Sequence, residues 1–373
     1  MKAEADLLPV DHWQATLLGR VLTKAGPSPV VIRDGKVHDL TAIAPTVSDL
    51  LDLDDVTKLS GPVIGETAEL VTGQGLRLLA PVDLQCIKAC GVTFAVSAIE
   101  RVIEERALGD ASQAAAIRGD LENKVGSGVR AVVPGTPEAM SLKAALIDAG
   151  MWSQYLEVAI GPDAEVFTKA PVLSAVGWGE EIGVRSDSHW NNPEPEIVLV
   201  VDSKGRTRGA TLGNDVNLRD FEGRSALLLG KAKDNNASTA LGPFIRLFDD
   251  QFTMDDVRRA EVELVIDGPE GYRLEGVNRM SEISRDPTVL VQQTLSEHQY
   301  PDGFALFLGT LFAPVQDRDD SGRGFTHKPG DVVRISSPLL GTLVNRVVTS
   351  KDATPWTFGI RDLMCNLAER GLL

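Results

Sequence analysis

Alternating apolar and polar positions divide the first part of the chain into short strands. In residues 15–40, Gly-Pro and Asp-Gly pairs separate apolar runs, a pattern typical of strands joined by tight turns and ending in a hairpin. A helix is predicted to follow over residues 46–55, with Thr46 as its N-cap. Together these elements predict a small α/β N-terminal domain over residues 1–75.

Helical spacing replaces this pattern after Gly91. Apolar residues recur there among charged residues and good helix formers, and we expect two helices that separate near Gly109. A further helix is expected over residues 137–150, with Gly150 as its C-terminal glycine. We interpret residues 92–150 as a helical lid segment, a term kept for this stretch below.

Strand signals dominate the chain from Val158 onward. The segments that read as strands or strand pairs are residues 196–213, 262–281, 303–315 and 328–348. A last helix is predicted over residues 360–371. Strands and helices do not alternate regularly along the chain. The pattern therefore does not suggest a doubly wound sheet. It predicts an α+β protein with a mainly-β domain over residues 76–373, which includes the lid segment.

The composition is that of an acidic globular protein. The chain has 373 residues, 43% of them apolar, and a formal net charge of −16, which disfavours nucleic acid and anionic membranes as partners. Neither a signal peptide nor a run of about 18 uncharged apolar residues is present, so we expect a cytoplasmic protein. We interpret Cys86 and Cys90 as ordinary buried residues rather than zinc ligands, because no second ligand pair follows at suitable spacing.

A pair of carboxylates opens the apolar strand PEPEIVLVV. Residues two apart in a strand point to the same face, so Glu194 and Glu196 repel each other unless a cation lies between them. Asp215 follows the return strand of the hairpin, where antiparallel pairing can bring it beside this pair. Ligand sets made only of carboxylates favour Mg²⁺, with Mn²⁺ or Ca²⁺ as alternatives. The structural alternative is a solvated edge strand, with Asp215 capping a helix that begins near Val216.

Three separated motifs resemble those of the fumarylacetoacetate hydrolase family. They match the family's E-x-E, N-D-x-x-x-R-D and Lys before L-G-P motifs in order, as Glu194-Pro195-Glu196, Asn214-Asp215-Val216-Asn217-Leu218-Arg219-Asp220, and Lys233 ahead of Leu241-Gly242-Pro243. The resemblance covers roughly residues 80–350. It implies a catalytic domain of the family's mixed β-sandwich roll type and a homodimer or homotetramer.

The resemblance also implies a metal site. Glu194, Glu196 and Asp215 would supply three oxygen ligands to Mg²⁺, with substrate and water oxygens completing six. Lys233 would face the substrate, and the nearby Lys231 is its competitor for that role.

Further residues are implied in substrate binding. Gly309 and Thr310, which match the family's G-T after a hydrophobic strand, would bind the substrate carboxylate. Arg219 would contact the substrate, or it would equally serve as a structural partner of Asp220 or of a neighbouring carboxylate.

The sequence departs from the family's hydrolases at the catalytic base. Many of those enzymes activate water with a histidine, but none of the chain's five histidines falls in the corresponding segment, GVTFAVSAIERVIEER. Ser97, Glu100 and Glu104 occupy that segment instead. His189, five residues before Glu194, is the histidine that could still reach the site.

The segments GVTFAVSAIERVIEER and KAKDNNASTALGPFI resemble the family's sugar-acid dehydratases. This implies a Mg²⁺-dependent lyase that converts a 2-keto-3-deoxy-pentonate to 2-oxoglutarate semialdehyde through a metal-bound enolate, in non-phosphorylative pentose catabolism. The metal would polarise the ketone and acidify the C3 protons. Glu100 or Glu104 would act as acid/base; Lys233 would remove the C3 proton if its pKa is lowered, or only stabilise the enolate.

Three alternatives stay open from the sequence. Glu100 and Glu104 also fit an exposed helical face with charged partners four residues away. The chain could be a C–C hydrolase of a 2,4-diketo acid, which requires a positioned water and a base. It could also be a metal-stabilised binding protein without catalysis.

Overall fold

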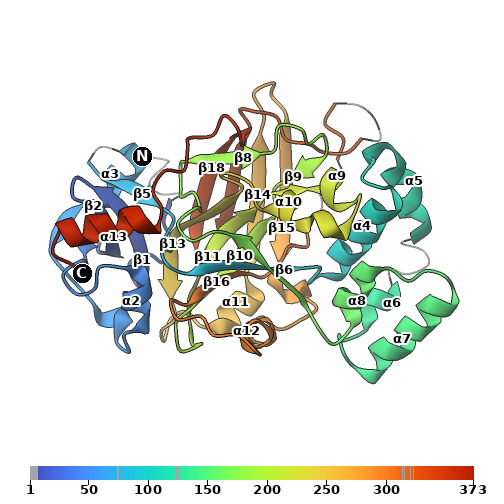
Figure 1. The fold of residues 1–373 in the computed structure, drawn as a ribbon, viewed down its shortest axis with the longest axis horizontal. Helices are drawn as coiled ribbons and strands as arrows, with labels where there is room; N and C mark the ends of the chain where they lie inside the picture. Colours follow the sequence, from blue (N-terminus) through green and yellow to red (C-terminus); the bar gives the residue numbers. More distant parts are fainter. Residues whose placement is uncertain are drawn as a thin grey trace.

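The strands of the N-terminal part continue a long sheet that crosses the middle of the molecule (Figure 1). The computed structural model describes residues 7–73, 75–121, 127–312, 314, 316–319, 321 and 323–373. Strands in the sheet follow the order β4-β3-β2-β1-β13-β11-β10-β16-β6-β7, and β5 also pairs with β1. Their bounds are β1 Leu17–Thr23, β2 Gly26–Arg33, β3 Lys36–Asp39, β4 Val63–Glu66, β5 Arg77–Leu79, β6 Cys86–Gly91, β7 Glu165–Ala170, β10 Pro195–Val201, β11 Thr207–Asp215, β13 Thr239–Leu247 and β16 Phe304–Phe307.

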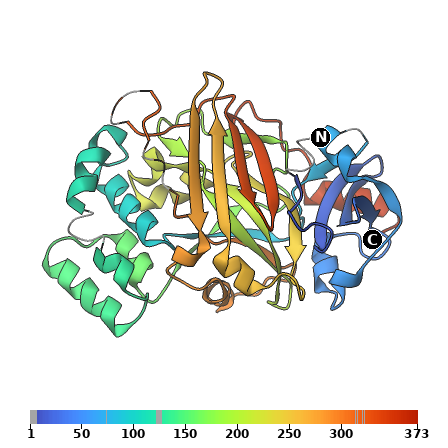
Figure 2. The same cartoon turned by 180° about the vertical axis from the view of Figure 1, so that it is seen from behind.

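A second sheet lies against this one and appears in orange and red in Figure 2. Its order is β15-β14-β17-β18-β8. The bounds are β8 Glu181–Val184, β14 Glu261–Asp267, β15 Arg273–Arg279, β17 Val332–Ser337 and β18 Gly341–Thr349. A short ladder of β9 (Asn191–Asn192) and β12 (Asn217–Leu218) flanks the two sheets.

Strand β10 is buried along its whole length between two apolar clusters. Ile197 and Leu199 belong to the cluster shared with the second sheet, which includes Leu264. Val198 and Val200 belong to the cluster on the opposite side. Successive side chains of a strand point to opposite faces, so this run of apolar residues fills both cores and fixes the start of β10 rigidly.

Helices gather at the two ends of the molecule (Figure 1). The lid segment and the residues after it form one group, α4 Ala95–Arg106, α5 Ala111–Leu121, α6 Ser127–Ala131, α7 Pro137–Asp148 and α8 Gln154–Ile160. At the opposite end lie α2 Val47–Asp52, α3 Thr67–Thr72 and α13 Ile360–Glu369. The remaining α-helices are α9 Arg219–Glu222, α10 Leu229–Lys233, α11 Met254–Arg259 and α12 Pro287–Leu295, with 3₁₀ turns at Val56–Lys58, Ala226–Leu228 and Met280–Glu282.

The predicted elements agree closely with this structure. Thr46 caps α2 by accepting from the Asp49 amide, and Gly109, at φ 75°, lies between α4 and α5. Gly150, at φ 66°, follows α7 as expected. The α+β class is confirmed, whereas the boundary at residue 75 and lid motion stay predictions. No helix in the described ranges is long and apolar enough to span a bilayer.

Candidate metal centre and its helical cover

Three buried carboxylates meet where β10 begins and β11 ends. The strand register pairs Pro195 with Asn214, and the Asp215 amide donates to the Glu194 carbonyl at 3.1 Å. One carboxylate oxygen from each of Glu194, Glu196 and Asp215 lies within 4.8 Å of the others. The exposed fractions are 6%, 1% and 2%, which excludes the solvated-edge alternative. The juxtaposition predicted from hairpin pairing is therefore confirmed.

Backbone groups hold this cluster in place. Gly309 donates its amide to Glu196 Oε2 at 2.6 Å. A side chain at position 309 would bring Cβ to 2.0 Å from Thr93 Oγ1, and the φ of 92° is one that glycine adopts without strain. The glycine of the predicted G-T pair thus supports the Glu196 carboxylate, while Thr310 lines a cavity beside Glu194.

Two buried lysines face the carboxylates. Lys233 Nζ lies 2.5 Å from Glu194 Oε2 and 3.0 Å from Asp215 Oδ2, and Lys169 Nζ lies 3.1 Å from Asp215 Oδ1. Burial alone lowers the pKa of Lys233, but the charges of Asp215 and Glu194 outweigh it and raise that pKa above its ordinary value. Lys231 is exposed and lies over the Phe221 ring, so the choice of Lys233 over Lys231 agrees with the geometry.

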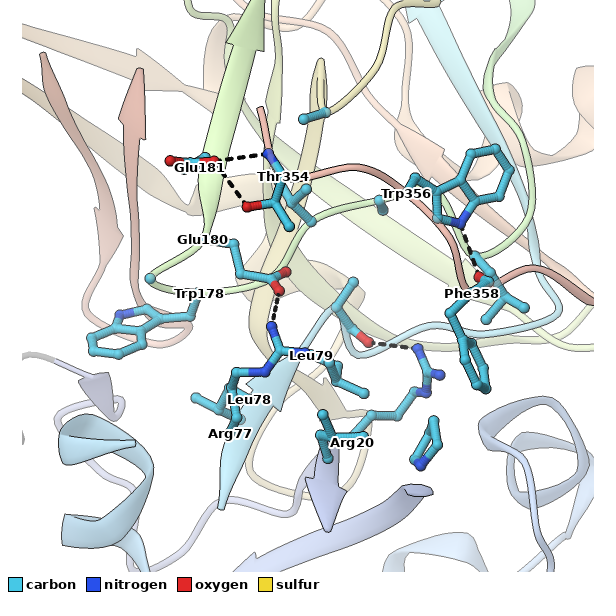
Figure 3. Close-up of a pocket in the computed structure, with 18 of the residues that line it drawn as sticks. Arg20, Arg77, Leu78, Leu79, Trp178, Glu180, Glu181, Thr354, Trp356 and Phe358 are labelled. Carbon is cyan, nitrogen blue, oxygen red and sulfur yellow. Dashed lines mark hydrogen bonds and ion pairs between the residues drawn. The ribbon is translucent and has the colours of Figure 1, made fainter. Parts of the chain in front are cut away.

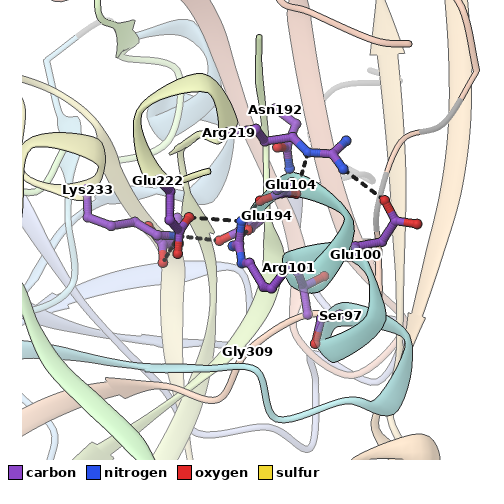
Figure 4. A network of polar contacts seen from close by, with 12 residues as sticks. Ser97, Glu100, Arg101, Glu104, Asn192, Glu194, Arg219, Glu222, Lys233 and Gly309 are labelled. Atoms are coloured by element: carbon purple, nitrogen blue, oxygen red, sulfur yellow. Dashed lines mark hydrogen bonds and ion pairs between the residues drawn. The ribbon is translucent and has the colours of Figure 1, made fainter. Parts of the chain in front are cut away.

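Arg101 of helix α4 points toward the carboxylate cluster (Figure 4). Arg101 Nη2 lies 2.8 Å from Glu194 Oε1, and its Nη1 lies 2.7 Å from Glu104 Oε2 and 2.8 Å from Glu222 Oε2. One guanidinium therefore joins the lid segment, helix α9 and a carboxylate of the metal centre.

Arg219 lies on the other side of this network. Its Nε lies 2.6 Å from Glu104 Oε1 and its Nη2 2.9 Å from Glu100 Oε2, while the guanidinium stacks on Trp190 at 4.3 Å. Arg219 is therefore a partner of neighbouring carboxylates and not of Asp220, whose carboxylate accepts from Ser188 and from a backbone amide. Contact of Arg219 with substrate stays a prediction.

Glu100 and Glu104 of α4 are buried ion-pair partners, not an exposed face. Glu100 is 7% exposed and Glu104 2%. Burial raises the pKa of Glu100, but its hydrogen bonds from Arg118 and the charge of Arg219 outweigh this and hold the pKa below its usual range. Both side chains line the same cavity as Glu194.

The donor set and its charge suit a divalent cation. Seven carboxylates and five cationic side chains gather here, namely Glu100, Glu104, Glu165, Glu194, Glu196, Asp215 and Glu222 with Arg101, Arg118, Arg219, Lys169 and Lys233. Full ionisation leaves two negative charges. Burial and the charges of Asp215 and Glu194 accordingly raise the pKa of Glu196. Three oxygen donors without thiolate or imidazole fit Mg²⁺.

Sequence reasoning missed Arg101, Glu222, Lys169 and Glu165. Glu222 is 3% exposed, and burial raises its pKa from 4.5 to about 7 although Arg101 and Lys233 oppose the shift. Apart from Glu222, these residues lie 25 or more positions in sequence from the motif residues that they approach. Local spacing therefore does not distinguish them from surface charges. The one available signal was Arg101 itself, which lies between the two glutamates that were singled out.

His189 does not join the site. Its backbone amide donates to Asp220 Oδ2 at 2.7 Å, and its ring lines a separate cavity of about 400 Å³. Among the described residues, the polar contacts of the three metal-centre carboxylates involve lysine, arginine and backbone amides but no imidazole.

The cavity beside Glu194 is small, about 20 Å³, which is room for roughly one water molecule. A larger cavity of about 710 Å³ lies between the N-terminal strands and the segment Thr354–Phe358 (Figure 3). It contains the 2.6 Å ion pair of Arg77 with Glu180, and none of the metal-centre carboxylates lines it. The size of a cavity therefore does not select the candidate site, whereas the cluster of buried charges favours the smaller cavity beside Glu194.

Comparison with known proteins supports the family resemblance seen in the sequence motifs. Residues 149–348 match the family described as fumarylacetoacetate (FAA) hydrolase C-terminal. The chain is 32% identical over 193 residues to "2-dehydro-3-deoxy-D-arabinonate dehydratase" of Saccharolobus solfataricus, which is 51% of this chain and 60% of the relative. It is 31% identical over 202 residues to "Probable 2-keto-3-deoxyxylonate dehydratase" of Haloferax volcanii, which is 54% of this chain and 66% of the relative. These matches thus span less than two thirds of either relative.

A solved structure shows the same fold over most of the chain. It is "2-keto-3-deoxy-D-arabinonate dehydratase complexed with magnesium and 2,5-dioxopentanoate", with a TM-score of 0.65 and 24% identity. The superposition covers 89% of this chain and 99% of that one. The expected fold class is therefore confirmed.

Proposed function

The chain belongs to the fumarylacetoacetate hydrolase family, and on that premise we propose that it is a metal-dependent 2-keto-3-deoxy-pentonate dehydratase. The reaction removes a C3 proton and the C4 hydroxyl as water, and the product tautomerises to 2-oxoglutarate semialdehyde. Names of the two curated relatives support this substrate class.

One observation carries the proposal. The metal-centre carboxylates are surrounded by Lys233, Arg101, Glu100 and Glu104, and no imidazole of the described residues contacts them. A C–C hydrolase needs a base to activate water, whereas a dehydratase needs a charge that stabilises an enolate and a carboxylate that moves one proton. The residues present meet the second requirement, and the names of the two curated relatives favour dehydration over hydrolysis, for which a glutamate could also serve as the base.

The metal, held by Glu194, Glu196 and Asp215, would supply Lewis-acid polarisation of the 2-oxo acid. Lys233, which the neighbouring carboxylates keep protonated, suits the role of stabilising the developing enolate oxygen rather than that of a base. We assign the substrate carboxylate to Thr310, which lines the cavity beside Glu194.

Proton transfer is assigned to the glutamates of α4. Glu100 and Glu104 line the cavity and are held by arginines, and the arginines around Glu100 keep the pKa of its carboxyl below the usual range. One of them takes the proton from C3 and then delivers it to the departing C4 hydroxyl, so that water leaves and the carboxylate is regenerated. Arg219 holds both side chains in position and, by the family resemblance, contacts the substrate.

The test is a parallel NMR time course with Mg²⁺-loaded protein. One sample contains a 2-keto-3-deoxy-pentonate and the other a 2,4-diketo acid. The proposal predicts 2-oxoglutarate semialdehyde from the first and no cleavage of the second. Pyruvate and a second carboxylic acid from the diketo acid, with the sugar acid unchanged, would mean a C–C hydrolase.

A further inference from the structure

Two buried carboxamides beside the metal centre carry polar atoms without partners. Asn192 of β9 and Asn217 of β12 pair directly across their short ladder. They are 3% and 1% exposed. Within the described part of the chain, Asn192 Oδ1 and both Oδ1 and Nδ2 of Asn217 have no hydrogen-bond partner. A buried polar group left in this state destabilises the fold, so a compensating ligand is expected.

Both carboxamides line the small cavity beside Glu194. Figure 4 shows Asn192 next to Arg219 and Glu104, at the end of the cluster away from Lys233. A ligand whose 2-oxo acid end meets the carboxylate cluster therefore has its opposite end within reach of these two side chains.

The chemistry of the unpartnered atoms selects the ligand group. Asn192 and Asn217 each offer an acceptor oxygen, and Asn217 adds a donor. A carboxylate or ketone brings no proton to an acceptor, whereas a hydroxyl both donates and accepts. Interchanging the two atoms of the Asn217 amide leaves one donor and one acceptor, so the match to a hydroxyl is unaffected.

We propose that Asn192 and Asn217 form a hydroxyl-recognition subsite that selects the hydroxylated end of the sugar acid. This inference rests on the proposed function and adds a specificity-determining pair to it. Two acceptors suit the two hydroxyls that a 2-keto-3-deoxy-pentonate carries beyond C3.

The neighbouring Asn191 shows what a structural carboxamide looks like here. Its Oδ1 accepts from the His327 amide at 3.0 Å, and its Nδ2 donates to Ser188 Oγ at 3.1 Å. It is equally buried, at 1% exposed, but it does not line the cavity. Asn191 is therefore a matched control on the same strand.

The experiment compares kcat/KM for a 2-keto-3-deoxy-pentonate and for 4-hydroxy-2-oxopentanoate, which lacks only the C5 hydroxyl. Wild-type protein should prefer the first by at least about 10-fold, because a site built to bind a hydroxyl rejects the analogue without it. Asn217→Leu and Asn192→Leu keep the branching and the number of heavy atoms of the side chain, and they should reduce this preference to within about threefold. Asn217→Ser is measured as well, in case the leucine variant does not fold.

Two further readouts separate recognition from structure. Asn217→Leu should keep or raise the Tm, because it removes unpartnered polar atoms, whereas Asn191→Leu should lower the Tm and keep the preference. Affinity for oxalate, which chelates a metal but has no hydroxyl, should be the same in wild type and Asn217→Leu.

The possible failures are distinct. If wild-type protein dehydrates both substrates and the Asn217 and Asn192 variants keep its preference, the subsite is wrong and the proposed function stands. If wild-type protein dehydrates neither substrate, the proposed function fails and the subsite with it.

Discussion

Arg101 Nη2 lies 2.8 Å from Glu194 Oε1, so the lid segment is tied directly to a carboxylate of the metal centre. The same guanidinium pairs with Glu104 and Glu222. The adjoining cavity, of about 20 Å³, has room for roughly one water molecule, so we expect this network to rearrange when the proposed substrate binds. Arg101 thus stabilises the buried carboxylates of the site and also lines the small cavity beside Glu194.

Replacing Arg101 tests its supporting role. Arg101→Met leaves three buried carboxylates without their shared cation, and removal of one partner from a buried ion pair costs about 3–5 kcal/mol. Urea unfolding should show that loss. Arg106→Met, at an exposed position of the same helix, should stay within about 0.5 kcal/mol of wild type. Equal stability of the two variants would refute the network's importance.

The glutamates of α4 are tested one at a time. Glu100→Gln and Glu104→Gln keep the side-chain shape but cannot carry a proton, and at least one should lower kcat about 10²–10⁴-fold. Glu105→Gln is the control, because Glu105 contacts Ser153 and Gln154 instead of the site. Near-normal turnover in both Glu100→Gln and Glu104→Gln would contradict the acid/base assignment.

Glu222 should make stability depend on pH. Its pKa rises from 4.5 to about 7 on folding, mainly through burial. The folded protein then binds more protons than the unfolded chain between these values, so stability falls as pH rises through that window. Glu222→Gln cannot titrate and should lack this decline. The check is denaturant unfolding of EDTA-treated wild type and Glu222→Gln from pH 4.5 to 8. If the stability of the two proteins changed with pH in parallel, the raised pKa of Glu222 would be contradicted.

Metal binding should stabilise the folded chain. A cation that binds only the native state adds about 2.7 kcal/mol at 100 times its Kd, so Mg²⁺ should raise the Tm of EDTA-treated protein. Glu196→Gln should abolish this increase, because Glu196 is one of the three proposed ligands. Glu181→Gln, whose carboxylate accepts from Thr354, is the control and should keep it. An unchanged Mg²⁺ response in Glu196→Gln would remove Glu196 from the ligand set.

The sequence allowed the metal centre to be predicted because its geometry is local. Glu194 and Glu196 are two apart, and the hairpin to Asp215 has a short turn, so strand periodicity determines which side chains meet. The extended sheet was not foreseeable in the same way. The pairing of β1 with β13 joins Leu17 to Arg246, and no local pattern encodes a contact between residues so distant in sequence.

Helices α4 and α5 could likewise be predicted from the sequence only in part. The positions of α4 and α5 follow from apolar spacing and from Gly109. The ion-pair partners of the charged residues in these helices do not follow from the spacing, because Glu100 and Glu104 fit a solvated helical face equally well. Only the packing of α4 against α5, α8 and α9 turned Glu100 and Glu104 into buried partners of Arg219.

One measurement tests the central claim most directly, that the carboxylate cluster holds a divalent cation needed for dehydration. EDTA-treated protein is mixed with ¹³C-labelled 2-keto-3-deoxy-pentonate and followed by NMR before and after Mg²⁺ is added. The account predicts no change before addition and steady formation of 2-oxoglutarate semialdehyde after it. Product formation at the same rate without the metal, or no product with it, would contradict the account.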